Sequence, residues 1–301
     1  MVQRVGFVGV GIMGEGMAAN LVKAGFAVTV VAHRNRAPVE RLVAAGAREA
    51  ASLVDLAREA EVVVTCVPND AAIEEVLLGE GGIAAGAEKG LIVVDTSTIS
   101  PLTSQRLAEA LGQRGVTMLD APISGGQAGA AAGTLAIMVG GPQAAYEQVL
   151  PLLQAMGKSI TYVGGNGAAL AVKLVNNLIV ASTLVAVSEG FTMAAKAGVD
   201  PAVVQQVLAG ATARSYVVQD KVPGSILKGN LQPGFKLALM HKDMGLALDF
   251  GKALQVPMFG TALVHQLFTQ ALGLGKGDLD CIAISELYTE PAQVSLEARK
   301  E

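Results

Sequence analysis

Lys173 and Asn177 are polar side chains in the most apolar part of the chain, residues 170–187. In a helix they share one face, because residues four apart are neighbours on the helix surface. A lysine in a nearly uncharged helix is costly unless it is paired or used, and desolvation lowers its pKa toward values that suit proton transfer. The pattern therefore favours Lys173 as a general acid/base with Asn177 beside it. The alternative is a lysine that extends to the surface from a helix end.

A glycine-rich segment near the start of the chain predicts a dinucleotide site. It reads Gly-Val-Gly-Ile-Met-Gly, directly after an apolar run and directly before a helical pattern. In that setting Gly9 permits a tight turn, Gly11 lets backbone amides approach a pyrophosphate, and Gly14 lets helix and strand pack closely. We expect Ile12 and Met13 to lie in the same cofactor-binding loop. The alternative is a glycine-rich turn without a ligand.

The segment after the expected second strand bears on the choice between NADP and NAD. It contains His33, Arg34, Asn35 and Arg36, and residues 16–39 hold no aspartate or glutamate. An NAD site usually places an acid here to accept from the ribose hydroxyls, whereas forked arginine donors suit a 2′-phosphate. We therefore expect these four residues to bind the cofactor, with NADP favoured and NAD as the alternative. A solvated basic turn is the competing interpretation.

Two further segments follow expected strands and so lie at the carboxyl edge of the sheet, where open α/β folds bind ligands. Val67 and Pro68 end the third expected strand, and Thr96 follows the next one. We expect all three to contact the cofactor, Thr96 at its nicotinamide half. Thr96 and Ser97 could also cap the helix that begins near Pro101.

Ser124, Gly125 and Gly126 follow another expected strand. A hydroxyl with two glycines at a strand end offers exposed backbone amides, which suit a substrate carboxylate. The alternative is an ordinary loop that needs glycine for its shape.

These residues need a scaffold of alternating strands and helices. The expected strands are Val5–Val8, Val28–Val31, Val62–Val67, Leu91–Asp95, Thr117–Asp120 and Leu135–Val139, with a further short strand near Ala47 and Arg48. Helical patterns such as Met17–Ala24 and Leu102–Gln113 separate them, which is typical of βαβ units and a mostly parallel sheet. After residue 164 long apolar segments at helical spacing take over. The sequence therefore predicts an α/β fold, with a Rossmann domain over 1–164 and an all-α domain of five or six helices over 165–301, entered through a long helix.

The composition of the chain indicates which kinds of binding partner to expect. The formal net charge of −4 and the isoelectric point near 5.5 provide no basic surface for nucleic acid, and polar residues interrupt the long apolar stretch, so we expect neither nucleic acid nor a membrane as partner. Two distant cysteines and no secretory leader predict a cytoplasmic protein without disulfides or a metal site. With 51% hydrophobic residues and 16% charged ones, some apolar surface is expected to lie in the interface of a homodimer or homotetramer.

In order and spacing, the glycine segment, the Asp120–Gly126 segment and the Lys173/Asn177 pair resemble the β-hydroxyacid dehydrogenase family, which includes 3-hydroxyisobutyrate dehydrogenase and tartronate and succinic semialdehyde reductases. The resemblance continues in residues 133–141 and in residues 235–247. One departure is Ala169, where family members often have glycine. Lys173 stays in register with the family motif.

The resemblance implies an NAD(P)-dependent enzyme acting on a small carboxylate-bearing substrate of the 3-hydroxyisobutyrate, tartronate semialdehyde, succinic semialdehyde or glyoxylate class. Lys173 would be the catalytic acid/base, Asn177 would hold the substrate, and Thr96 and Lys242 would contact the cofactor. It also implies an active site between a Rossmann and an all-α domain, and oligomerisation through the helical domains. The alternatives are an imine reductase-like enzyme, which usually lacks the lysine at 173, and a non-catalytic dinucleotide-binding module.

Overall fold

The computed structural model describes residues 2–298, and the chain forms two compact units that divide between Lys173 and Leu174. The division lies inside helix α9 (Ala168–Lys196), whereas the predicted boundary at residue 164 precedes that helix.

The first unit contains a sheet of nine strands, counted over the described residues. Six of them run parallel in the order β3-β2-β1-β4-β5-β6, and β8, β7 and β9 extend the sheet beyond β6. β8 is antiparallel to β6 and β7 and parallel to β9. The strands are β1 (Arg4–Val8), β2 (Ala27–Val31), β3 (Arg48–Ala50), β4 (Val62–Thr65), β5 (Ile92–Asp95), β6 (Thr117–Asp120), β7 (Ile123–Ser124), β8 (Leu135–Gly140) and β9 (Gly157–Gly164).

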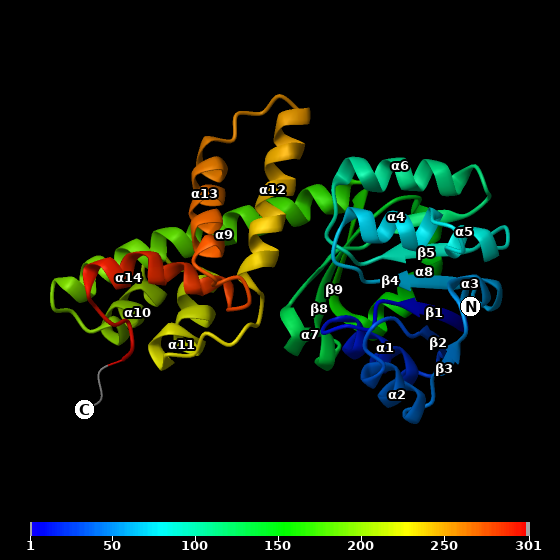
Figure 1. Cartoon of the computed structure of the whole chain (residues 1–301), viewed down its shortest axis with the longest axis horizontal. Helices are drawn as coiled ribbons and strands as arrows, with labels where there is room; N and C mark the ends of the chain where they lie inside the picture. The colour runs from blue at the N-terminus through cyan, green and yellow to red at the C-terminus, as the bar shows by residue number, and fades with distance from the viewer. Residues whose placement is uncertain (1, 299–301) are drawn as a thin grey trace. The chain divides into compact units, whose positions relative to one another are not determined.

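Helices cover both faces of this sheet, which is why its central strands carry apolar residues on both faces. In β4, Val62 and Val64 belong to one apolar cluster and Val63 belongs to another, and all three are fully buried. The first cluster includes residues of α1 (Gly14–Lys23), α2 (Ala37–Ala44) and α8 (Gln143–Met156), and the second includes residues of α3 (Leu53–Glu59), α4 (Asp70–Leu78), α5 (Ile83–Gly86) and α6 (Pro101–Gly112). Figure 1 shows α4 and α6 on one side of the strands and α1 and α2 on the other.

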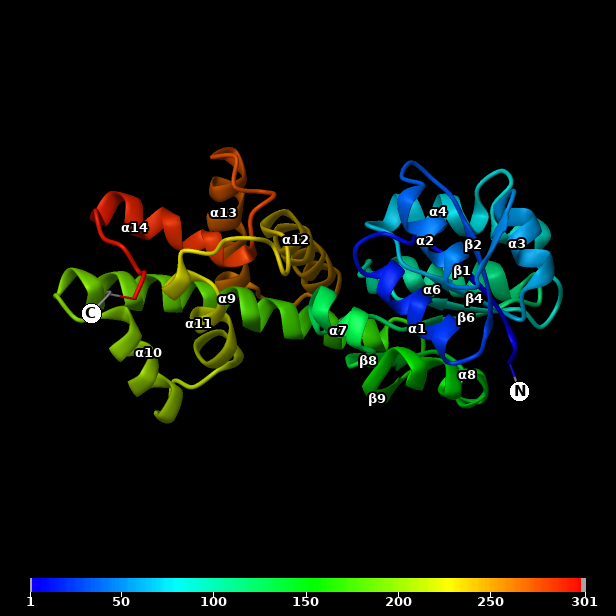
Figure 2. The ribbon, with the colours of Figure 1, turned by 90° about the horizontal axis from the view of Figure 1, so that it is seen from below.

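The second unit is helical. Beyond α9 it contains α10 (Pro201–Gly210), α11 (Val222–Gly224), α12 (Leu237–Ala253), α13 (Phe259–Gly273) and α14 (Glu286–Ala292), with short π and 3-10 turns between them. In Figure 2, α10 and α11 lie below α9 and α13 and α14 lie above it. The core of the second unit contains apolar residues from these helices and from the 3-10 turn Cys281–Ser285, among them Leu184, Phe191, Met244, Phe268 and Ile282.

By length and composition alone, α9 also meets the criterion for a membrane span, with a mean hydropathy of 1.9 in its most apolar window, of which 39% is buried. The core helix of a soluble protein meets the same criterion.

The predicted α/β class, the mostly parallel Rossmann sheet and the long helix that leads into a helical region are confirmed.

Candidate active site

The glycine loop between β1 and α1 turns too tightly for side chains. Gly9 has a φ of +93°, and a Cβ there would collide with the carbonyl oxygen of Cys66. A Cβ at Gly14 would collide with the carbonyl oxygen of Gly9. At Gly11, by contrast, an added Cβ would have no other described atom within 4 Å. Tight packing beneath the loop and open space above it fit a pyrophosphate at the first turn of α1.

This loop stands at the place where the strand order of the sheet reverses. β1 lies between β2 and β4. After β1 the chain adds β2 and β3 on one side of it, and then adds β4, β5 and β6 on the other side. Such a switch point, at the carboxyl ends of the strands, is where open α/β sheets bind ligands. Of the remaining loop residues, Ile12 is exposed and Met13 is half-buried. The loop is therefore both placed and shaped to receive a dinucleotide.

The basic segment after β2 is exposed, and its two arginines differ in their contacts. The guanidinium of Arg36 lies 3.0 Å from the carboxylate of Glu49 and 3.9 Å from that of Glu40. Within residues 2–298, Arg34 forms no ion pair and no side-chain hydrogen bond. The side chain of Asn35 accepts from the amide of Ala37 at 3.2 Å, and His33 is exposed. Arg34 is therefore the arginine of this segment whose donors are available to a ligand.

A buried carboxylate organises the carboxyl ends of β4 and β5. Asp95 accepts hydrogen bonds from the hydroxyl of Thr65 at 2.7 Å and from the hydroxyl of Ser97 at 2.6 Å. Its second oxygen, Oδ2, has no hydrogen-bond partner among the described residues. Burial raises the pKa of Asp95 to about 6, against the opposing effect of these hydrogen bonds. Thr96, also buried, donates its hydroxyl to the carbonyl of Thr65 at 2.7 Å.

The same network reaches the segment after β4. The hydroxyl of Ser97 accepts from the amide of Val67 at 2.9 Å, while Pro68 next to it is exposed. The expectation that Thr96 and Ser97 could cap the following helix is wrong, because Ser100 caps α6 by accepting from the amide of Leu102. Thr96 and Ser97 instead tie the ends of two strands together.

Ser124 ends the short strand β7, and Gly126 begins α7 (Gly126–Ala132). Gly125 and Gly126 both have positive φ angles, +136° and +63°, so the backbone reverses sharply between strand and helix. Ser124 is half-buried and Gly125 is exposed. The predicted carboxylate site thus lies on an accessible turn at a helix start.

Lys173 and Asn177 both lie on α9 and are 6% and 4% exposed. The amide of Asn177 donates to Oδ2 of Asp243 at 2.5 Å, and Nζ of Lys242 lies 3.2 Å from Oδ1 of the same carboxylate. Asp243 is buried in α12, and sequence reasoning did not single it out. Its place next to Lys242, which was predicted to contact the cofactor, was the available signal. Asn177, Lys242 and Asp243 are thereby joined within the second unit.

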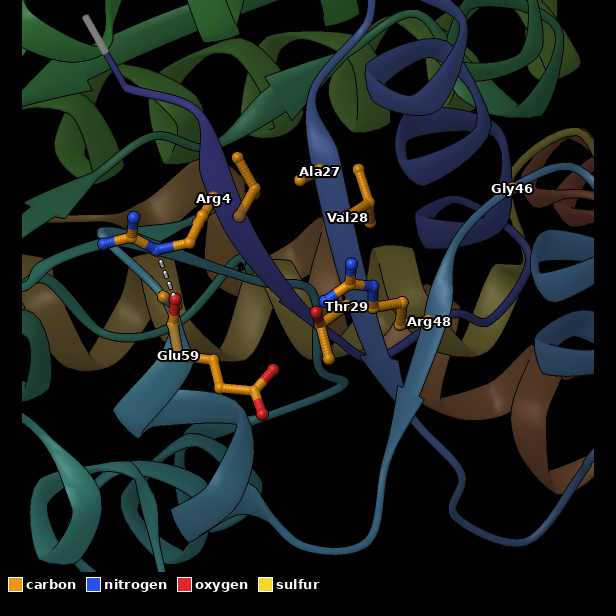
Figure 3. A pocket seen from close by; sticks show the side chains of 9 residues that line it. Arg4, Ala27, Val28, Thr29, Gly46, Arg48 and Glu59 are labelled. Carbon is orange, nitrogen blue, oxygen red and sulfur yellow. Dashed lines mark hydrogen bonds between the residues drawn. The ribbon is translucent and has the colours of Figure 1, made fainter.

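A hollow and a cysteine in the first unit are two further candidates for parts of a site. A hollow of about 270 Å³, lined by Arg4, Thr29, Arg48 and Glu59 among others, opens near the amino ends of β1 and β2, the edge opposite the glycine loop (Figure 3). Burial raises the pKa of the Cys66 thiol to about 11, so it is not a thiolate at neutral pH. No cluster of three or more potential metal-ligating acids, histidines or cysteines occurs in residues 2–298.

Two family models match the chain. The model for the NAD binding domain of 6-phosphogluconate dehydrogenase matches residues 4–164, and the model for the NAD-binding domain of NADP-dependent 3-hydroxyisobutyrate dehydrogenase matches residues 167–288. The 2-hydroxy-3-oxopropionate reductase of Escherichia coli is 41% identical over 93% of this chain and 95% of its own length. The 2-(hydroxymethyl)glutarate dehydrogenase of Eubacterium barkeri is 38% identical over 97% of both chains.

Solved structures of similar proteins have the same fold as this chain. Mycobacterium tuberculosis 3-hydroxyisobutyrate dehydrogenase with L-serine has a TM-score of 0.88 at 31% identity, covering 95% of this chain and 99% of its own. Psf3 in complex with NADP+ and 2-OPP has a TM-score of 0.84 at 30% identity, covering 94% and 99%. An imine reductase from Pseudomonas, at 19% identity and a TM-score of 0.59, shares the fold alone. The chain belongs to the β-hydroxyacid dehydrogenase family of NAD(P)-dependent oxidoreductases.

Proposed function

We propose that the protein transfers a hydride between NADP(H) and a small hydroxy acid or its semialdehyde, with Lys173 as general acid/base. The observation that carries the proposal is the burial of Lys173, the only charged residue in the segment 168–188 of α9. Burying a charged group is costly, and charged groups kept in buried positions concentrate at functional sites, which supports a catalytic use of this ammonium.

The chain's own residues would supply the proton and hold the substrate. When bound, the reduced nicotinamide provides the hydride to the carbonyl carbon of the substrate. Lys173 donates a proton from Nζ to the carbonyl oxygen as the C=O bond electrons move onto that oxygen, which yields the alcohol. In the reverse direction the same nitrogen accepts the hydroxyl proton. Asn177, whose amide is oriented by Asp243, would hold the substrate.

A carboxylate on the substrate would bind at Ser124, Gly125 and Gly126. The turn exposes backbone there, and the start of α7 favours a negative group. The names of the two relatives given above describe substrates that carry a carboxylate but differ in the rest of the molecule. We therefore propose recognition of the carboxylate as the constant part, with 3-hydroxyisobutyrate, tartronate semialdehyde, succinic semialdehyde and glyoxylate as the substrates to compare.

The test has two parts. Wild type is assayed on those four compounds with both cofactors, and turnover of none of them would contradict the proposed reaction. Lys173→Ala is then expected to lower kcat by about a hundredfold or more while the Kd for NADPH changes less than about twofold. Lys158→Ala removes an exposed lysine of β9 and serves as the control with unchanged kcat. Retention of more than about a tenth of kcat in Lys173→Ala would overturn the assignment.

Cofactor preference is proposed to depend on Arg34 more than on Arg36, because Arg36 already pairs with Glu49 and Glu40. A charge-assisted hydrogen bond is worth about 1.5–3 kcal/mol, so Arg34→Ala is expected to raise the NADPH Kd by about ten- to a hundredfold. The NADH Kd should stay the same, and Arg36→Ala should have the smaller effect. Equal weakening of both cofactors by Arg34→Ala would show that Arg34 does not contact the 2′-phosphate. A wild type that prefers NADH would reject NADP as the cofactor.

A further inference from the structure

Asp120 is a second buried carboxylate at the carboxyl edge of the sheet, and it contacts the start of α9. It is the last residue of β6 and is fully buried. Its Oδ1 accepts from the backbone amide of Gly167 at 2.8 Å, and its Oδ2 lies 3.4 Å from the amide of Leu170. The side chain of Asn166 adds a donor to Oδ1 at 3.4 Å. The carboxylate of Asp120 thus contacts the amide just before α9 and an amide in the first turn of α9. In the sequence Asp120 lies 47 residues before Gly167.

These contacts have the character of a helix cap supplied from outside the helix. The first amides of a helix have no partner within it, and Leu170 holds the third amide of α9, a position that capping side chains commonly bind. A carboxylate is also favoured there by the partial positive charge of the helix start. Lys173 follows Leu170 by three residues, less than one helical turn. Fixing the amide of Leu170 therefore fixes the turn from which Lys173 projects.

The surroundings leave the carboxylate little freedom. Gly140 of β8 packs against it so closely that a Cβ at Gly140 would lie 2.7 Å from Oδ2 of Asp120. On the other side, Asn166 donates to the carbonyl of Met118 at 2.8 Å and so fastens the loop before α9 to β6. Burial raises the pKa of Asp120, against the opposing effect of the amides of Gly167 and Leu170. Every contact named here lies within the first unit.

We propose that Asp120 is a positioning residue for the reaction: it anchors the first turn of α9 and thereby sets the place of Lys173. This inference rests on the proposed role of Lys173. The sequence pattern joins Asp120 to the Ser124–Gly126 segment, and the structure joins it to α9 as well. The segment proposed to bind the substrate carboxylate and the helix that carries the proton donor are therefore fastened to the same side chain.

Asp120→Asn is the direct test, because the amide keeps the shape of the side chain but cannot accept from both Gly167 and Leu170. Amide hydrogen exchange over residues 165–173 is expected to speed up at least tenfold, with exchange elsewhere unchanged. A small displacement of a reacting group can cost about a hundredfold, so kcat should fall by about ten- to a hundredfold at an unchanged NADPH Kd. The solvent isotope effect on kcat should rise, because the proton step becomes slower; a purely structural loss would not change it.

Two further variants make the outcome decisive. Ser104→Ala removes a hydroxyl that also lies 3.4 Å from Oδ1 of Asp120 but forms no hydrogen bond with α9 among the described residues, and it should leave exchange and kcat unchanged. Asn166→Ala removes the other side-chain donor to Asp120 and should speed up exchange and lower kcat as Asp120→Asn does, but more weakly. If Asp120→Asn does not fold, the result for Asn166→Ala decides whether the proposal holds. Faster exchange with kcat within twofold of wild type, or unchanged exchange, would overturn the proposal. A wild type without turnover would reject the proposed function instead, while the exchange data would still decide whether Asp120 anchors α9.

Discussion

In the first unit the buried acids Asp95 and Asp120 are bound by hydroxyls and amides, whereas in the second unit Asp243 and Asp280 each lie beside a lysine. Within residues 2–298 no ion pair involves Asp95 or Asp120. Their pKa values are raised, mainly by burial. In the first unit these buried carboxyl groups therefore bind protons more readily than usual. In the second unit the buried carboxyl groups Asp243 and Asp280 form ion pairs with lysines.

The backbone explains this difference. The ends of parallel strands and the helix starts beside them offer amides and hydroxyls that no regular ladder uses, so a buried acid there finds neutral donors. Inside a helix such as α12 the amides are already bonded to carbonyls of the same helix. Asp243 therefore relies on side chains, among them Asn177 and Lys242. Asp280, just before a 3-10 turn, uses both kinds of partner: backbone amides and Lys221.

The surfaces of the units differ as well. Of the 17 large hydrophobic residues that are exposed among those described, 13 belong to the second unit, although it is the shorter one. Ile179 and Met193 of α9, at 56% and 72% exposure, are examples. Exposed apolar side chains concentrated on one part of a protein favour a contact with another copy. We therefore propose that the protein forms a homodimer or homotetramer through the helical unit.

The largest expected effect tests this surface contrast. Ile179→Glu places a charge in the proposed interface, and a two-fold contact would contain that change twice, for a loss of about 3–6 kcal/mol. The dissociation constant of the oligomer should rise by more than about a hundredfold, measured by sedimentation. Val43→Glu, at a residue of α2 with 42% exposure, is the matched change in the first unit and should leave assembly intact. A wild type that sediments as a monomer at micromolar concentration would contradict the interface.

The next effect tests the ion pairs of the second unit. Nζ of Lys221 lies 2.7 Å from Asp280, and Lys221→Met leaves that buried carboxylate without its cation. We expect the free energy of unfolding, measured in urea, to fall by about 3–5 kcal/mol. Lys236→Ala breaks an exposed pair with Asp278 and should lower the free energy of unfolding far less. Similar losses in the two variants would show that burial does not distinguish these pairs.

The smallest effect tests the acids of the first unit through pH. Because the pKa of Asp95 is raised from 3.8 to about 6 on folding, the folded state holds a proton that the unfolded state releases between these values. Its contribution to the free energy of unfolding is complete below about pH 4 and is lost as the pH rises through about 6, a change of up to about 3 kcal/mol. Asp95→Asn should remove this part of the pH dependence in urea titrations. An unchanged slope in the variant would mean that Asp95 is ionised throughout.

Much of the fold could be predicted because buried parallel strands leave a strong pattern. The strand at Thr117–Asp120 has its predicted bounds, and the faint expectation near Arg48 corresponds to β3. The predicted strand Val62–Val67 ends instead at Thr65, where the chain turns before Pro68. β9 was missed because, among the described residues, it pairs with β8 alone and three of its eight residues are exposed, so apolar residues do not dominate it.

The sequence singles out candidate site residues where residue type and close spacing suffice, as in the glycine loop and in Lys173 with Asn177, and their roles stay predictions. The residues that contact these candidates in the folded chain could not be predicted. Asp243 lies 66 residues from Asn177, and Asp120 lies 50 residues from Leu170, so only the folded chain brings each pair together. The difference between Arg34 and Arg36 likewise depends on Glu49, a residue of the neighbouring strand β3.

The continuity of α9 has a consequence for recombination between relatives. A chimera joined between residues 173 and 174, where the contacts divide, takes Lys173 from one parent and Asn177 from the other. A chimera joined between 164 and 167, where the two family models meet, keeps both on one parent but separates Asp120 from the amides that it binds. Each junction divides interacting groups between the two parents, so we expect an exchange of first units between members of this family to need matching residues at the start of the helix.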